Sequence, residues 1–300
     1  MDRILVTGGL GFIGSHLADA LLQKGHEVTI LDRNKKPVYK PDCRIIYGDI
    51  RKRRDVEQAA KGKDKIFHLA AQASVAISVS EPQMTAETNV IGTLNLLDAA
   101  VKNKIENFVN ISSCSVYGEA KYLPVDEKHE LNPKSPYAAS KLAAEEFCRT
   151  YHNLHGLNVN SMRFFNVYGP RQQGEYAGVI QIFINKLKKK KQPVIFGDGE
   201  QTRDFVYVKD AADAAIAASK LKGCEAFNIG LGQQQTVNSI AKSIIAHFGS
   251  NLKPDYQPPR AGDPRHMLAD ITKAEKMLSY KPMYTFDKGL KETLEYFSKN

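Results

Sequence analysis

The sequence predicts an α/β protein with a doubly wound parallel sheet, followed by a smaller α/β lobe at the C-terminal end. Short runs rich in β-branched and aromatic residues alternate with stretches whose apolar residues recur at helical spacing, a pattern typical of βαβ units. The strands are almost continuously apolar, as expected of strands covered by helices on both faces. A chain of 300 residues is long enough to bury such a sheet.

The elements of the first part follow one another in a regular order. The predicted strands are Ile4–Val6, Val28–Leu31, Arg44–Tyr47, Ile66–Leu69, Phe108–Ser112 and Val159–Phe165, and the predicted helices are Ser15–Gln23, Thr85–Lys102 and Ser135–His155. After the sixth strand the rhythm breaks, and Pro and Gly punctuate 169–178, 197–199 and 258–264. We therefore expect a dinucleotide-type domain over 1–168, with contributions from about 205–235, and a substrate lobe over 169–300.

The composition bounds the partners. The net charge is +9, concentrated at 51–54 and 186–191, and the second run ends an apolar-periodic stretch, where cations favour a helix C-terminus. Nucleic acid is therefore not expected as a partner. The apolar runs are strand-sized and no signal peptide precedes the first strand, so we expect no membrane span and a cytoplasmic protein. The four cysteines are scattered, and no metal site is expected.

A glycine-rich turn follows the first strand, in the sequence TGGLGFIG at 7–14. Glycines at 8, 11 and 14 let backbone approach a pyrophosphate at a helix N-terminus, whose N–H groups bind anions. Asp32 ends the second strand, where a carboxylate accepts hydrogen bonds from both ribose hydroxyls and repels a 2′-phosphate. This favours NAD over NADP, although the adjacent Arg33 is a residue type that accommodates a 2′-phosphate.

A tyrosine and a lysine lie four residues apart in Tyr137-Ala-Ala-Ser-Lys141, so their side chains emerge on the same helix face. An ammonium beside a phenol lowers the phenol pKa, which would make Tyr137 a general base near neutral pH. Ser112 and Ser113 end a strand upstream, where side chains point into the ligand crevice of an open sheet. Ser113 is then expected to bind the oxygen that Tyr137 deprotonates.

These motifs together resemble the extended short-chain dehydrogenase/reductases, a family with a Rossmann domain. The resemblance rests on the glycine turn, Asp32 and the sequences HLAAQ at 68–72, NVIGT at 89–93, SSCSVYG at 112–118, SPYAASK at 135–141, RFFNVYGPRQ at 163–172, VIFGDGEQTRDFVYVKD at 194–210 and RAGD at 260–263. The last two are similar to segments of UDP-galactose 4-epimerases and their UDP-hexosamine relatives. The resemblance runs across nearly the whole chain.

The resemblance implies roles for matching residues. The implied NAD-binding residues are Gly8, Gly11, Phe12, Ile13, Gly14, Asp32, Arg33, Asp49, Ile50, Leu69, Ala70, Ala71, Asn89, Ser112, Tyr137, Lys141 and Phe164. The implied residues for a UDP-sugar are Ser113, Asn166, Val179, Val194, Phe196, Arg203, Arg260 and Asp263. The implied catalytic residues are Ser113, Tyr137 and Lys141. From the residues alone, ion pairs of Arg203 with Asp204 or Asp210, and of Arg260 with Asp263, are equally good explanations of the arginines.

The implied reaction is inversion at C4 of a UDP-hexose, by transient oxidation to the 4-keto sugar, rotation and hydride return. Related dehydratases carry an Asp-Glu pair directly after the strand-end Ser/Thr, and related decarboxylases carry Glu at the position of Ser115. This chain has Cys114-Ser115 there. A uronic acid 4-epimerase, decarboxylase or dehydratase, a net dehydrogenase and a non-catalytic NAD-sensing protein remain alternatives.

Three further expectations concern specificity and assembly. Met267 stands where a family pocket residue limits the C2 substituent, which leaves UDP-glucose and UDP-N-acetylglucosamine both open. Cys114 is expected to be a buried structural cysteine that faces away from the substrate. Helices near 86–100 and 137–150 have apolar residues on a second face besides the one expected to pack on the sheet. In the family that the chain resembles, this pair of helices forms a dimer's four-helix bundle, so we expect a homodimer.

Overall fold

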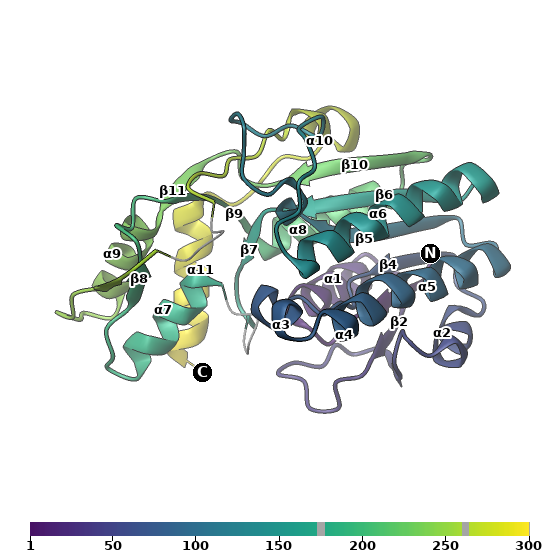
Figure 1. Cartoon of the computed structure of the whole chain (residues 1–300). Coiled ribbons are helices and arrows are strands. Elements are labelled where there is room, and N and C mark those ends of the chain that lie inside the picture. Colours follow the sequence, from purple (N-terminus) through teal and green to yellow (C-terminus); the bar gives the residue numbers. More distant parts are fainter. Residues whose placement is uncertain (173–177, 260–263, 300) are drawn as a thin grey trace.

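The computed structural model of the chain describes residues 1–172, 178–259 and 264–299. Its main feature is a seven-stranded parallel sheet in the order β10-β6-β5-β4-β1-β2-β3, which confirms the predicted fold class (Figure 1). Its strands are β1 (Arg3–Thr7), β2 (Glu27–Asp32), β3 (Arg44–Tyr47), β4 (Lys65–His68), β5 (Asn107–Ser113), β6 (Asn158–Phe164) and β10 (Cys224–Ile229). The six strands predicted from the sequence lie within one or two residues of six of these.

Alternate residues of each central strand enter cores on opposite faces of the sheet. On β1, Ile4 and Val6 pack in a core with α1 (Phe12–Gln23) and α8 (Val208–Ala218). Leu5 packs on the other face, in a core with α2 (Arg53–Ala60), α5 (Gly92–Lys102) and α6 (Pro136–His155). The sheet is thus covered on both faces, which explains its continuously apolar strands.

The predicted helix over Thr85–Lys102 is confirmed, but it contains a π-helical turn that the sequence did not predict. The structure has α3 (Val75–Ser80), α4 (Pro82–Ala86), a π-helical turn over Glu87–Ile91 and then α5. Inside the π turn, Asn89 donates to the Gln72 carbonyl (2.9 Å) and Ser140 Oγ (2.9 Å), and accepts from the Gln72 amide (2.7 Å). The extra residue of a π turn is a common device for aiming one side chain out of register.

The smaller lobe lies beside the carboxyl ends of the sheet strands (Figure 1). It contains a sheet of β11 (Gln234–Thr236), β9 (Thr202–Tyr207) and β7 (Asn166–Tyr168), and a pair of β12 (Asp255–Gln257) with β8 (Val194–Phe196). One apolar core joins it to α7 (Val179–Lys188), α9 (Val237–His247) and α11 (Phe286–Lys299), while α10 (Thr272–Leu278) packs on β10. Across the described ranges, no helix is long and apolar enough to span a bilayer.

Candidate active site

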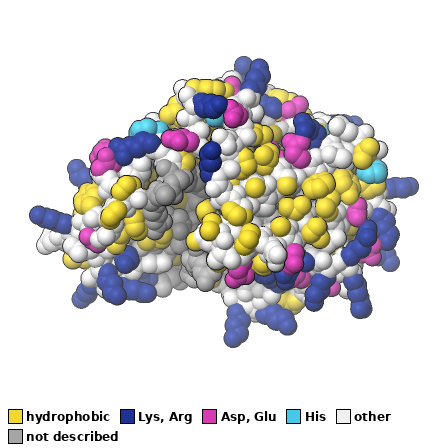
Figure 2. Space-filling model, viewed as in Figure 1, with side chains coloured by type: hydrophobic (Ala, Val, Ile, Leu, Met, Phe, Trp, Pro, Cys, Tyr) yellow, Lys and Arg dark blue, Asp and Glu magenta, His cyan; other side chains and the backbone are white. Residues whose placement is uncertain are grey.

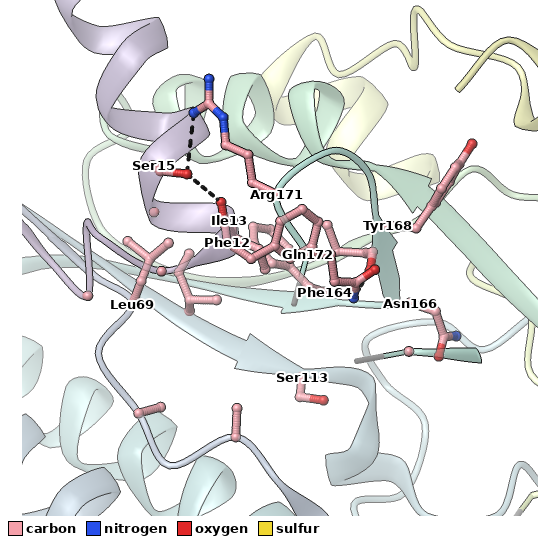
Figure 3. Close-up of a pocket in the computed structure, with 18 of the residues that line it drawn as sticks. Phe12, Ile13, Ser15, Leu69, Ser113, Phe164, Asn166, Tyr168, Arg171 and Gln172 are labelled. Carbon is pink, nitrogen blue, oxygen red and sulfur yellow. Dashed lines mark hydrogen bonds between the residues drawn. The ribbon is translucent and has the colours of Figure 1, made fainter. Parts of the chain in front are cut away.

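A cleft of about 1650 Å³ opens between the carboxyl edge of the large sheet and the smaller lobe (Figure 3). This is the place where open α/β sheets bind their ligands. The predicted residues that line it are Gly8, Gly11, Phe12, Ile13, Gly14, Asp32, Arg33, Asp49, Ile50, Leu69, Ala70, Ala71, Ser112, Ser113, Tyr137, Lys141, Phe164, Asn166, Val179, Val194, Phe196 and Arg203. Its volume exceeds that of an ordinary drug-sized pocket, so it has room for two nucleotide-sized ligands.

The glycine turn fits a pyrophosphate group. Gly8 has φ +71°, and a Cβ on it would lie 2.7 Å from the Ala70 amide nitrogen. A Cβ on Gly14 would lie 2.2 Å from the Gly8 carbonyl oxygen, so the turn closes only with glycine at both positions. Gly11 caps α1 without a side-chain hydrogen bond, which leaves the first-turn N–H groups to an anionic ligand.

Asp32 ends β2 with its carboxylate fixed by backbone donors. The Leu10 amide donates to Oδ2 and the Asn34 amide donates to Oδ1, each at 2.9 Å. A carboxylate has about four lone-pair sites, so these two bonds orient Asp32 and leave acceptor capacity toward the cleft. This arrangement suits the hydroxyls of an adenosine ribose.

At the same end of the cleft, Asp49 is held by a neighbouring arginine. Arg51 Nη2 lies 2.6 Å from Asp49 Oδ2, and this hydrogen-bonded pair holds the pKa of Asp49 below its usual value. The buried Ile50 supplies an apolar surface beside it. A polar edge next to an apolar wall is what a flat heteroaromatic base needs, and the adenine position stays a prediction.

The catalytic helix starts where the sequence SPYAASK places its capping residue. Ser135 Oγ accepts from the Ala138 amide (3.2 Å), and Pro136 occupies the first helical position, where a missing N–H costs nothing. Tyr137 and Lys141 therefore lie on the first turns of α6 and both line the cleft. Ser113, at the end of β5, lines the cleft with them, and its hydroxyl lowers the pKa of the Tyr137 phenol. The structure thus brings the predicted catalytic trio together.

The electrostatics of this trio differ from the prediction that Lys141 lowers the pKa of the tyrosine. Burial raises the pKa of Tyr137 to about 12, and the Ser113 hydroxyl opposes this rise. Burial also lowers the pKa of Lys141 to about 8, while Glu145 raises it. The Lys141 ammonium donates to the Ile111 carbonyl oxygen at 2.7 Å, so its charge is directed to the β5 backbone rather than to the phenol.

A buried polar network fixes β5 against α6 behind the trio. Arg163 on β6 makes a bidentate ion pair with Glu145 on α6, with Nη2 to Oε2 at 2.7 Å. Glu145 also accepts a hydrogen bond from Ser112 Oγ. The side chain of Ser112 is therefore engaged in this network, and the next residue, Ser113, is held at the cleft. Glu145 and Arg163 were not expected at the site from the sequence.

The predicted substrate side is assembled from both parts of the chain. Asn166 Nδ2 donates to the Asp204 carbonyl oxygen (2.9 Å), which fixes the amide at the start of β7. Phe196 ends β8, and Arg203 lies on β9. The carboxylate of Asp204 accepts hydrogen bonds from the backbone amides of Leu231 and Gly232. These bonds stabilise the buried carboxylate, so an ion pair with Arg203 is not needed to explain its burial. Arg260 and Asp263 lie outside the described residues.

Three residues singled out in the sequence are absent from the described cleft lining. Asn89 is buried between the Gln72 backbone and α6. Met267 packs in a small core with Val116, so the structure does not place it against a sugar substituent. Cys114 is partly buried and packs against the same core, and burial raises the pKa of its thiol to about 12. Its structural role stays a prediction.

Other residues line the cleft without having been predicted. They include Tyr39, Arg171, Gln172, Lys186 and Gln201. Tyr39 lies in the segment between β2 and β3, where no motif marks it. Arg171 follows a Gly-Pro pair in the sequence RFFNVYGPRQ, which was itself part of the resemblance and was the available signal. Figure 3 shows its guanidinium on Ser15 in the first turn of α1.

Some members of the two basic runs make ion pairs or hydrogen bonds at the surface. Arg51 pairs with Asp49, and Arg53 Nη2 lies 2.7 Å from Asp98 Oδ2. Lys186 and Lys188 lie in the last turn of α7, as predicted for cations at a helix C-terminus. Among the residues that the structure describes, no group of three or more His, Cys, Asp and Glu side chains is arranged to hold a metal ion.

Comparison with known proteins identifies the relatives of this arrangement. Residues 4–230 match the NAD dependent epimerase/dehydratase family. The chain is 42% identical over 306 residues to the putative UDP-glucose 4-epimerase of Methanocaldococcus jannaschii, with 99% of both proteins covered. The UDP-glucose 4-epimerase of Thermotoga maritima, solved with UDP-glucose, is 40% identical with a TM-score of 0.95, and 99% of each chain is covered. The Thermus thermophilus UDP-glucose 4-epimerase, solved in complex with NAD, is 35% identical with a TM-score of 0.91 and the same coverage. These similarities confirm the predicted resemblance and the predicted cofactor, NAD.

Proposed function

We propose that this chain, which belongs to the NAD-dependent epimerase/dehydratase family, inverts the C4 hydroxyl of a UDP-linked hexose. The observation that carries the proposal is the catalytic trio at the cleft, together with the two residues that follow Ser113 in the sequence. Ser113, Tyr137 and Lys141 supply proton transfer at a hydroxyl. Cys114 and Ser115, which follow Ser113, have no carboxylate that could transfer a proton at a sugar carbon in a second step.

In this proposal each member of the trio has a distinct task. Tyr137 takes the proton from the C4 hydroxyl and later returns it, while Ser113 holds the same oxygen by a hydrogen bond. Lys141 supplies the positive charge that favours the phenolate once its ammonium faces Tyr137. When bound, NAD supplies a reversible two-electron oxidation at C4, and it would be held by the glycine turn, Asp32 and the Lys141 side of the cleft.

Inversion follows if the oxidised sugar turns about its diphosphate link before reduction. Arg203 would hold the diphosphate, since a guanidinium can bind two phosphate oxygens at once. Phe196 would stack on the uracil, and Asn166 would contact the diphosphate. In domain terms, we assign cofactor binding to 1–168 with about 205–235, and UDP-sugar binding to 169–300.

The alternatives within the family differ in needing one more acid or base. Elimination of water requires a proton acceptor at C5 and a donor at C6, and decarboxylation requires a uronic acid substrate. The Cys114 thiol, with its raised pKa, is a poor base, and Ser115 Oγ is buried. These features favour a reaction that ends with return of the electrons to C4.

The test is incubation of the purified protein with UDP-glucose, UDP-galactose, UDP-N-acetylglucosamine and UDP-glucuronic acid, followed by NMR of the products. Substrate deuterated at C4 should give the C4 epimer with its deuterium retained, and reaction in D₂O should place none on the sugar carbon. Deuterium uptake from solvent at carbon, or net formation of a dehydrated or decarboxylated sugar, would contradict the proposal.

We also propose that the protein is a homodimer. Hydrophobic side chains gather on the face over α3, α4 and α5 (Figure 2). Val75 and Val79 on α3 and Ile91 in the π turn are each about half exposed or more, at 49%, 65% and 47%. Exposed apolar clusters of this kind mark protein–protein contacts, and a second copy of the same face is the expected partner.

A further inference from the structure

Three segments far apart in the sequence meet beside the first turn of α1. Asp19 is on α1, Tyr39 is in the connection between β2 and β3, and Arg171 follows β7. The Arg171 guanidinium carbon lies 3.5 Å above the centre of the Tyr39 ring. Its Nη1 lies 2.9 Å from Asp19 Oδ2, and the Tyr39 hydroxyl donates to Asp19 Oδ1 at 3.1 Å. We call this group the Tyr39–Arg171 clasp.

The clasp belongs to the cofactor side of the cleft. Tyr39 and Arg171 both line it, as do Asp32 and the residues directly after it. Arg171 Nη1 donates to Ser15 Oγ (3.3 Å), and Ser15 lies in the α1 turn whose N–H groups are placed for a phosphate. A guanidinium has five N–H donors, and the polar contacts described here use Nη1, so Arg171 has donors for an anion at this helix end.

The turn that carries Arg171 is held in an unfavourable conformation. Arg171 has φ +69°, a region that L-residues other than glycine seldom adopt. The preceding residue is tied to α1, because His16 Nε2 lies 3.0 Å from the Pro170 carbonyl oxygen. Burial lowers the pKa of His16 to about 4, so the imidazole is neutral and carries its proton on Nε2. Strained backbone that is fixed from several sides is common at ligand sites.

We infer that the Tyr39–Arg171 clasp retains NAD in the cleft between catalytic cycles. A dinucleotide with its ribose on Asp32 and its phosphates at the α1 N-terminus is flanked by the segments that carry Tyr39 and Arg171, which the clasp joins to each other and to α1. The cation–π contact and the ion pair must open before those segments separate. This inference rests on the proposed function, since a reaction that returns NAD to its starting state benefits from slow release.

The experiment measures release of NAD directly, without any sugar. Full-length protein loaded with fluorescent etheno-NAD is mixed with excess NAD, and the dissociation rate is followed by stopped flow. Tyr39→Ala should speed release about tenfold, the effect of losing one partly buried cation–π contact. Arg171→Ala should speed it at least as much, because it also removes the ion pair with Asp19 and the bond to Ser15. The double variant should be little faster than Arg171→Ala alone, because that substitution already removes the contact that Tyr39→Ala removes.

Two variants separate the clasp from general loosening of the fold. Tyr39→Phe keeps the ring and should release NAD within about twofold of the wild-type rate. Arg3→Ala removes a comparable arginine–aspartate pair, Arg3 Nη2 to Asp64 Oδ1 at 2.6 Å, outside the cleft, and should leave release unchanged. Unchanged release in Arg171→Ala and Tyr39→Ala, or equal acceleration in Arg3→Ala, would overturn the inference. So would equal acceleration in Tyr39→Phe and Tyr39→Ala.

Failure of the inference and failure of the proposed function give different results. If the clasp retains NAD and the function is right, the fast-releasing variants still epimerise UDP-sugars at saturating NAD. If the clasp is wrong, release is unaltered while epimerisation persists. If the function is wrong, no UDP-sugar is epimerised although the clasp variants still release NAD faster than wild type.

Discussion

Replacing Lys141 by Met should change how the stability of the protein depends on pH. Lys141 is buried, and burial lowers its pKa from 10.5 to about 8. Below pH 8 the ammonium is charged in both the folded and the unfolded chain, and the folded chain bears the cost of burying it. Between pH 8 and 10.5 the folded chain releases its proton first, so the unfolded chain binds more protons and this contribution to stability rises with pH.

The size of the effect follows from the two pKa values. At about 1.4 kcal/mol per pKa unit, lowering from 10.5 to about 8 corresponds to about 3 kcal/mol. At pH 7 Lys141→Met avoids the cost of burying the ammonium. The difference in the free energy of unfolding between Lys141→Met and the wild type should therefore shift by about 3 kcal/mol in favour of the wild type from pH 7 to pH 10.5. The cysteine thiols of Cys43, Cys114 and Cys148, whose pKa values burial raises, oppose the trend in the wild type. Cys43 and Cys114 are common to both proteins and cancel in the difference, whereas Cys148 interacts with Lys141, which lowers its pKa, and cancels only in part.

The assay is urea unfolding followed by far-UV circular dichroism, at several pH values from 7 to 10.5, on protein freed of NAD. Lys220→Met provides the control, because Lys220 is exposed after α8 and its loss should leave the pH dependence of the wild type intact. A stability difference between wild type and Lys141→Met that stays constant over this range would refute the claim that burial lowers the Lys141 pKa.

The remaining predictions concern catalysis, cofactor choice and assembly. Tyr137→Phe should lower kcat for epimerisation about 100- to 10,000-fold and Ser113→Ala less, with folding and NAD binding retained; a Tyr137→Phe enzyme of wild-type rate would exclude Tyr137 as the base. Titration should show NAD bound more tightly than NADP, because the fixed Asp32 carboxylate repels a 2′-phosphate; equal affinities would contradict this role. Light scattering should show a dimer, and Ile91→Arg should give a monomer by placing a charge on the exposed apolar face, whereas a wild-type monomer at every concentration would exclude the dimer.

The sequence predicts those parts of the site that short segments encode by themselves. The glycine turn is such a segment, because its conformation depends on contacts such as Gly14 against Gly8 within a few residues. The α6 start is another, since Ser135 and Pro136 fix the turn that carries Tyr137. Helical spacing shows that Tyr137 and Lys141 share a face. It does not show that the ammonium bonds to the Ile111 carbonyl, which depends on how α6 packs on β5.

The features that escaped prediction all depend on contacts between distant segments. The π turn at Glu87–Ile91 is adjusted to the Gln72 backbone and to α6, so the periodicity of its own sequence predicts only a continuous helix. The Tyr39–Arg171 clasp joins three segments, and neither Tyr39 nor Arg171 has a distinctive neighbour pattern. Motifs therefore identify the catalytic residues of a site better than the contacts that close the cleft around its ligand. Chemistry requires particular side chains at fixed local spacings, whereas closure requires only that two complementary side chains meet across a cleft. Relatives can meet that requirement with different residues at different positions, so cofactor retention is expected to vary among proteins that share the same catalytic trio.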